Sequence, residues 1–121
     1  MNRVIFYQRA EGIALFILAT AVYFYSGLNW LAYLLLLFSF DISMLGYLVN
    51  KKFGAEIYNF VHNLILPSIV ACIFLLFPHN MLLGLACLWF AHIGLDRALG
   101  YGLKLSSGFK DTHLGKIGKE K

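Results

Sequence analysis

The sequence predicts an all-α fold, an integral membrane protein built as an antiparallel bundle of four helices. Composition is the first reason, because the 121-residue chain is 60% hydrophobic and only 13% charged. Soluble domains are about 45–50% apolar and about 25% charged, and disordered chains are more polar still. The second reason is that four apolar segments approach the roughly 20 residues needed to span a bilayer. The third is that only short breaks separate these segments, which makes consecutive helices antiparallel neighbours.

The four elements follow one another within a single transmembrane domain. The domain is expected over residues 1–105, with spans at about 8–26, 29–50, 54–77 and 80–103. Gly27 and Asn29 separate the first two spans and are typical C-cap and N-cap residues. Residues 50–54 separate the second span from the third, and residues 78–80 precede the fourth. Residues 106–121 are rich in Gly, Ser and Lys and are expected to form a polar cytoplasmic tail.

Lys and Arg residues predict the orientation of the bundle. Apart from Arg97, they lie before or at the start of the first span, between the second and third spans, or after the fourth. The two loops on the opposite side contain neither residue. Because loops rich in Lys and Arg stay in the cytoplasm, both termini are expected there. The net charge of +4 fits attraction to a lipid bilayer with anionic headgroups. It does not indicate nucleic-acid binding, because the lysines are sparse and follow no motif.

Several ionisable residues lie inside the predicted spans, where a charge costs about 2.5–3.5 kcal/mol or more and usually marks a site. At 1.5 Å per residue, four of them lie about 10–16 Å below the cytoplasmic surface. These four are Asp41, His62, His92 and Asp96. His92 and Asp96 are four residues apart and share a helix face. Pro67 cannot bond the carbonyl of Asn63 and predicts a kink beside the cluster.

The leading hypothesis for this cluster is a metal-assisted hydrolase that acts on a lipid-like substrate. Two neutral imidazoles and a carboxylate form the ligand set of catalytic zinc, which keeps a fourth position for water. The ligands of zinc or another divalent metal are expected to be His62, His92 and Asp96 or Asp41. The other carboxylate then orients an imidazole or acts as general base. Nearer the surface, Glu11 and Arg97 join Asp41 and Asp96 as candidate catalytic residues.

Three non-enzymatic interpretations stay open. The first is a structural network in which Asp41 or Asp96 pairs with Arg97. The second is a pathway for protons or small solutes, which in a four-helix protein favours a homo-oligomer. The third is a haem held by His62 and His92. In the tail, Asp111 and His113 belong either to a solvated loop or to a lid that completes the site.

Several strings together resemble a bacterial family of small membrane proteins classed only as a domain of unknown function. They are Arg9-Ala-Glu11-Gly12, Asp41-Ile-Ser-Met-Leu-Gly-Tyr47, Tyr58-Asn59 with His62, the segment from His92 to Lys104, and the segment from Gly108 to Gly115. The resemblance spans nearly the whole chain and implies a four-helix protein of the bacterial inner membrane. It implies no activity, cofactor or catalytic residue. A looser similarity to bacterial membrane proteins described as metal-dependent hydrolases rests on membrane-level His and Asp residues alone.

Overall fold

The computed structural model describes residues 3–103, 111–112 and 115–116. The helices are α1 (Arg3–Tyr25), α2 (Trp30–Leu36), the 3-10 helix η1 (Ser39–Leu48), α3 (Lys51–His62), α4 (Ile65–Leu76) and α5 (Asn80–Ala98). Two short strands, β1 (Asp111–Thr112) and β2 (Gly115–Lys116), pair antiparallel. The second span comprises α2 and η1, and the third comprises α3 and α4. The described chain thus has four segments long and apolar enough to cross a membrane, as the sequence predicts.

Glycines in the left-handed conformation follow both unbroken helices. Gly27 has a φ of +75° and Gly100 a φ of +88°. After α5, the Tyr101 N–H donates to the Asp96 carbonyl at 2.7 Å and the Gly100 N–H to the Arg97 carbonyl at 3.1 Å. This pair of bonds defines a Schellman motif, which stops a helix. It explains why α5 ends at Ala98, before residue 103, the expected end of the fourth span.

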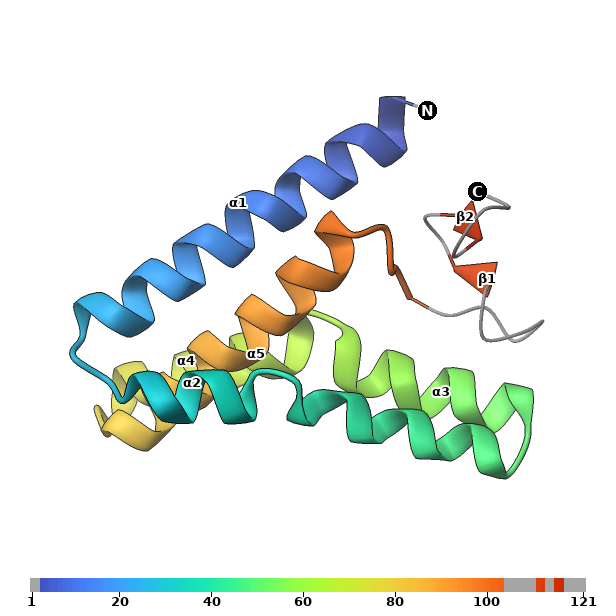
Figure 1. Cartoon of the computed structure of the whole chain (residues 1–121). Coiled ribbons are helices and arrows are strands. Elements are labelled where there is room, and N and C mark those ends of the chain that lie inside the picture. Colours follow the sequence, from blue (N-terminus) through green and yellow to red (C-terminus); the bar gives the residue numbers. More distant parts are fainter. Residues whose placement is uncertain (1–2, 104–110, 113–114, 117–121) are drawn as a thin grey trace.

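The first and last helices lie side by side in Figure 1, and α4 packs against α5. Their backbones come close because both contact surfaces carry a glycine. A Cβ atom added to Gly12 would lie 2.7 Å from the carbonyl oxygen of Gly94, and one added to Gly94 would lie 2.7 Å from the Phe16 nitrogen. Small residues allow helices to approach in this way inside membranes. The second and third spans form a separate antiparallel pair through η1 and α3.

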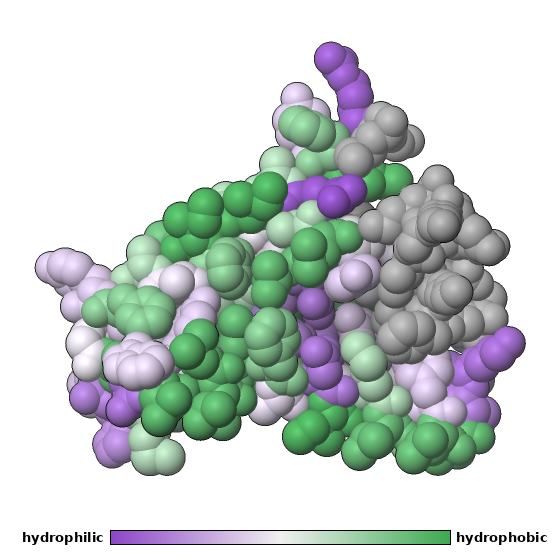
Figure 2. Space-filling model, in the orientation of Figure 1, coloured by the Kyte–Doolittle hydropathy of each residue, from purple (hydrophilic) through white to green (hydrophobic). Residues whose placement is uncertain are grey.

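A small apolar core lies between α1, α2 and α5. Its members are Ala19, Tyr23, Tyr33, Leu37, Cys87, Leu88 and Ala91. The tyrosine hydroxyls in this core find partners, since Tyr33 lies 2.6 Å from the Thr20 hydroxyl and Tyr23 donates to the Asn29 carbonyl at 2.6 Å. Most large apolar side chains face outward instead, and Figure 2 shows them as broad hydrophobic areas. A bilayer is the solvent that such a surface fits.

The ends of the spans lie on two opposite sides of the molecule in Figure 1. Residues 26–29 and 77–79 lie at one end of the bundle. The start of α1, the turn between η1 and α3, and the end of α5 lie at the other. Arg3, Lys51 and Lys52 therefore belong to one end of the molecule, which we call the basic end.

Candidate functional site

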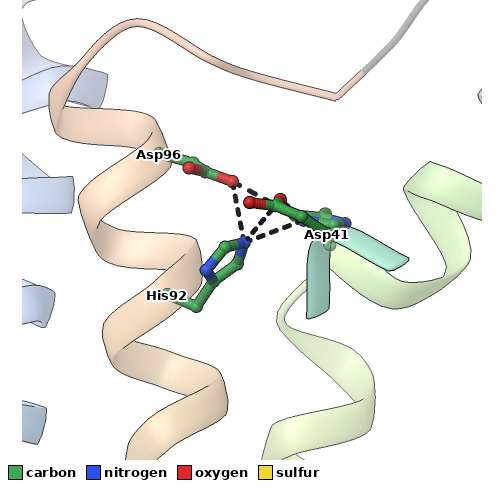
Figure 3. A group of neighbouring side chains, drawn as sticks. Asp41, His92 and Asp96 are labelled. Atoms are coloured by element: carbon green, nitrogen blue, oxygen red, sulfur yellow. Dashed lines mark hydrogen bonds and ion pairs between the residues drawn. The ribbon is translucent and has the colours of Figure 1, made fainter. Parts of the chain in front are cut away.

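Four ionisable side chains from three elements converge in the interior. Asp41 comes from η1, His62 is the last residue of α3, and His92 and Asp96 lie one turn apart on α5. Each offers one nitrogen or oxygen atom, and these four atoms all lie within 4.8 Å of one another. Figure 3 shows the Asp41 carboxylate facing His92 and Asp96 across the gap between helices. We call these four residues the His/Asp cluster.

The distances within the His/Asp cluster are short and uniform. His92 Nε2 lies 3.1 Å from Asp41 Oδ1 and 3.2 Å from Asp96 Oδ2. His62 Nε2 lies 3.5 Å from each of the same two oxygens. The two Nε2 atoms are 3.1 Å apart. Two imidazole nitrogens and two carboxylate oxygens thus point at one another, and the negative charges require a proton or a cation between them.

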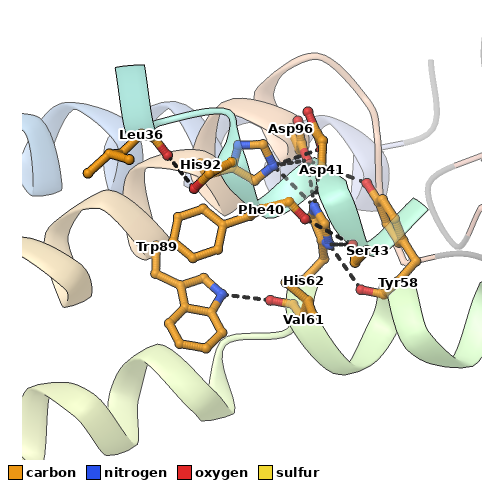
Figure 4. Close-up of polar contacts among 11 residues, drawn as sticks. Leu36, Phe40, Asp41, Ser43, Tyr58, Val61, His62, Trp89, His92 and Asp96 are labelled. Atoms are coloured by element: carbon orange, nitrogen blue, oxygen red, sulfur yellow. Dashed lines mark hydrogen bonds and ion pairs between the residues drawn. The ribbon is translucent and has the colours of Figure 1, made fainter. Parts of the chain in front are cut away.

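His62 is held by three neighbouring groups (Figure 4). Its Nδ1 lies 3.0 Å from the Tyr58 carbonyl and 3.4 Å from the Ser43 hydroxyl. A proton on Nδ1 donates to that carbonyl and leaves the Nε2 lone pair directed into the cluster. The Tyr58 ring also stacks on the imidazole at a centroid distance of 3.8 Å, and its hydroxyl donates to Asp96 Oδ2 at 3.4 Å. Sequence reasoning missed Tyr58 as a supporting residue, although its spacing of four from His62 places both on one face.

His92 is held by packing. Its side chain is fully buried, and Nδ1 has no hydrogen-bond partner among the residues that the structure describes. The Phe40 ring lies at a centroid distance of 5.6 Å from the imidazole and stacks on Trp89 at 5.2 Å. The polar chemistry of His92 is therefore directed through Nε2 into the cluster. The cluster is most open at Asp41, whose side chain is 36% exposed compared with 13% for Asp96.

The third span is broken beside the cluster. The Asn63 amide donates to the carbonyls of Asn59 and Phe60, both at 2.8 Å, and its oxygen accepts from the Ile65 N–H at 2.8 Å. The Trp89 indole donates to the Val61 carbonyl at 2.7 Å. These bonds satisfy backbone groups that the end of α3 would leave bare in hydrocarbon. The kink predicted from Pro67 is thus a complete break at residues 63–64, and Pro67 lies in the first turn of α4, where its missing N–H is harmless.

The second span is irregular at the same site. It leaves the α-helical conformation after Leu36 and continues as the ten-residue 3-10 helix η1 that carries Asp41. Such helices rarely exceed 3–4 residues, and longer ones often mark a functional site or hinge. Ser39 and Ser43 donate to the carbonyls three residues before them, at 2.7 and 2.9 Å. These bonds compete with regular helix geometry, and they are the local signal that sequence reasoning overlooked.

Glu11 and Arg97 are not part of the His/Asp cluster. Within the described residues, Asp41 and Asp96 form their ion pairs with the two histidines, and neither pairs with Arg97. Successive helix residues are about 100° apart, so Arg97 leaves α5 on a different face from Asp96. Together with Glu11 it lines a separate cavity of about 190 Å³ between α1 and α5.

The tail residues of the expected lid are only partly within the described structure. Asp111 belongs to β1, next to Thr112, which is 5% exposed. The side chain of Asp111 and the whole of His113 lie outside the described residues. Closure of the tail over the cluster therefore stays a prediction.

Comparisons with known proteins give a family and no activity. The family model described as a domain of unknown function (DUF4260) matches residues 6–117. No curated protein and no solved structure matches the chain. The resemblance to a family classed as a domain of unknown function is confirmed, and the matched region contains all of the quoted strings. With nearly its whole length matched, the chain belongs to the DUF4260 family of domains of unknown function.

Proposed function

We propose that the His/Asp cluster binds a divalent metal ion, with zinc the best fit, and that the protein is a metal-assisted hydrolase acting on a lipid-like substrate. The observation that carries this proposal is the convergence of four ligand atoms within 4.8 Å, on residues from three separate elements. Gathering two carboxylates in the interior of a membrane protein is costly unless a cation compensates their charge.

The spacing of the ligand atoms supports zinc. Around a tetrahedral zinc ion with bonds of about 2.0–2.1 Å, neighbouring nitrogen and oxygen ligands lie about 3.3–3.4 Å apart. The three proposed ligand atoms, Nε2 of His62, Nε2 of His92 and Oδ2 of Asp96, lie 3.1, 3.2 and 3.5 Å from one another. Imidazole nitrogen favours zinc over magnesium or calcium, which prefer oxygen ligands. His62 also has the second contact typical of a metal-binding histidine, through Nδ1 to the Tyr58 carbonyl.

The proposed reaction needs one ligand position for water. Catalytic zinc sites have three protein ligands and a water molecule, which the metal activates for attack. In this proposal His62, His92 and Asp96 hold the ion. Asp41 is the most exposed member and lies on the irregular helix η1. We therefore assign Asp41 the role of general base, which orients the attacking water molecule and takes a proton from it.

The orientation proposed from the sequence places this site on the cytoplasmic side of a bacterial inner membrane. The basic end of the molecule contains the start of α1 and the turn before α3, and the positive-inside rule assigns such an end to the cytoplasm. Asp96 lies near the end of α5, so it is close to this face. Substrate would then enter from the inner leaflet.

Metal analysis of the protein purified in detergent tests the binding step. One equivalent of zinc is expected after zinc loading and dialysis, and the His62→Ala, His92→Ala double variant is expected to bind none. His79→Asn is the matched control, because it removes a histidine but keeps an acceptor for the Met81 N–H at the start of α5. Equal zinc content in the double variant and the control would contradict the proposal.

Product analysis tests the hydrolase step. Zinc-loaded protein is incubated with bacterial polar lipids, and water-soluble and lipid products are identified by mass spectrometry. Asp41→Asn is expected to retain most of the zinc and lose turnover, because an amide cannot take a proton from water. Turnover that persists in zinc-free protein would contradict a metal-assisted reaction.

A second candidate function is ion translocation, and the breaks in two neighbouring spans favour it. Transporters bind ions where spanning helices are discontinuous, and here both the α2–η1 and the α3–α4 junctions lie near the His/Asp cluster. Uptake of zinc into proteoliposomes without lipid hydrolysis would select this function. The haem alternative gains no support, because the two Nε2 atoms are 3.1 Å apart and share their space with two carboxylates.

A further inference from the structure

The cavity between α1 and α5 has a polar, charged end and an apolar end. It has a volume of about 190 Å³, and its lining residues are Gln8, Glu11, Gly12, Leu15, Leu64, Ile93 and Arg97. Along α1, polar Gln8 and Glu11 come first and Leu15 follows one turn deeper. Along α5, which runs the opposite way, Ile93 lies one turn deeper than Arg97. The polar end of the cavity therefore faces the basic end of the molecule, and the apolar end faces the middle of the bundle.

Arg97 lies near the end of α5, and its guanidinium group has no hydrogen-bond partner among the residues that the structure describes. Its side chain is half-buried and interacts electrostatically with Glu11, Asp96 and Tyr58. It forms no hydrogen bond or ion pair with another residue that the structure describes. Arginine in this position presents five donors that match the oxygens of a phosphate group.

The packing of α1 against α5 fixes where this arginine lies. A Cβ atom added to Gly12 would lie 2.6 Å from the Arg97 Cβ. Only glycine at position 12 therefore allows the Arg97 side chain to pass this close to the backbone of α1. Arg9 donates from Nε to the Ala98 carbonyl at 2.9 Å, which ties the end of α5 to α1. Apart from Leu64, the cavity wall is thus built from two helices that these contacts hold in a fixed register.

We propose that this cavity binds the headgroup of a phospholipid that carries a primary amine, such as a phosphoethanolamine lipid. Arg97 binds the phosphate, and the Glu11 carboxylate accepts hydrogen bonds from the ammonium group. The acyl chains leave past Leu15 and Leu64 into the hydrocarbon, in line with the order of polar and apolar residues. At about 30 Å³ per water molecule, the cavity holds the volume of about six waters, which suits a headgroup.

This site is independent of the proposed metal centre. Its two residues on α5, Ile93 and Arg97, lie on the neighbouring face of that helix, and no lining residue is a member of the His/Asp cluster. Loss of lipid binding on substitution of Arg97 would leave zinc binding in place, and loss of zinc in the double histidine variant would leave the lipid site in place. The two proposals can therefore fail separately.

Native mass spectrometry of the detergent-purified protein tests the lipid site. Phosphoethanolamine, phosphoglycerol and phosphocholine lipids with identical acyl chains are added in turn. The wild-type protein is expected to retain the phosphoethanolamine lipid preferentially, because a quaternary ammonium cannot donate to Glu11 and a glycerol headgroup has no cation for it. Equal retention of all three lipids would overturn the proposal and would identify only a general lipid surface.

Variants assign the two headgroup contacts. Arg97→Gln is expected to weaken retention about tenfold or more, because it removes a charge-assisted contact, whereas Arg97→Lys keeps the charge and part of the binding. Glu11→Gln is expected to retain lipid but to lose the preference for the primary amine. Arg3→Gln, on the exposed start of α1, is the matched control for loss of a charge. If Arg97→Gln and Arg3→Gln retain the lipid as the wild type does, the site is not in this cavity.

Discussion

The first and last spans of the chain, which we call the outer pair, are built differently from the two middle spans, which we call the inner pair. The outer pair, α1 and α5, consists of unbroken helices of 23 and 19 residues that contact each other through glycines. The inner pair is interrupted in both members, after α2 and after α3. His92 and Asp96 lie on the unbroken helix, whereas Asp41 and His62 lie next to the interruptions. We infer that the outer pair fixes one half of the cluster and that the inner pair carries the half that can adjust.

The contact between the outer helices is the feature whose loss should cost the most stability. Gly94→Ala places a Cβ atom 2.7 Å from the backbone nitrogen of Phe16, and relief of such a clash costs about 1–3 kcal/mol. Unfolding in a denaturing detergent series measures the loss. Gly84→Ala is the matched control, because its Cβ would meet only ordinary contacts at 3.7 Å and beyond. If both variants have the same stability, the close approach of α1 and α5 does not hold the bundle together.

The break in the inner pair should depend on Asn63. Asn63→Ala removes two donated hydrogen bonds and one accepted bond at the α3–α4 junction. Because such capping bonds are worth about 0.5–2 kcal/mol, we expect a loss of stability in that range, smaller than for Gly94→Ala. Asn63→Asp keeps the acceptor for the Ile65 N–H and should recover part of the loss. If the Asn63→Ala variant is more stable than the wild type, the Asn63 hydrogen bonds do not stabilise the break between α3 and α4.

The support of the cluster by the inner pair should be visible in metal affinity. Tyr58→Phe removes the hydroxyl that donates to Asp96 Oδ2 but keeps the ring stacked on His62. Groups that orient a ligand contribute roughly 10–100-fold to metal affinity, and this bond is long at 3.4 Å, so about tenfold weaker zinc binding is expected by competition with a chelator. Unchanged affinity would remove Tyr58 from the list of supporting residues and leave ring stacking as its role.

The sequence predicts the convergence of the His/Asp cluster better than it predicts the local backbone. Ionisable residues stand out inside apolar spans because their burial is costly, and depth along each helix brings Asp41, His62 and His92 to one level. The breaks depend on partners that are distant in sequence, such as Trp89 for the Val61 carbonyl. No local pattern around residue 61 reveals that contact. The end of α5 is different, because Gly100 is a local signal for the Schellman motif and could have been used.

The candidate residues that the structure separates illustrate a second limit. Glu11 and Arg97 belong to the same half of the predicted spans as the His/Asp cluster, and depth alone groups them with it. The helix rotation of about 100° between Asp96 and Arg97 directs the arginine to the α1 side, into the cavity with Glu11. The side of α5 that faces α1 is set by the contact between Gly12 and Gly94. These two glycines are far apart in the sequence, so no local pattern predicts their contact.

The central claim is that the His/Asp cluster is a metal site, and X-ray absorption at the zinc edge of the zinc-loaded protein tests it most directly. The prediction is about four nitrogen and oxygen ligands at about 2.0–2.1 Å, with the outer-shell scattering of two imidazoles. Loss of that imidazole signal in the His62→Ala, His92→Ala variant would complete the assignment. A spectrum of zinc surrounded by oxygen alone, with no imidazole scattering in the wild-type protein, would contradict it.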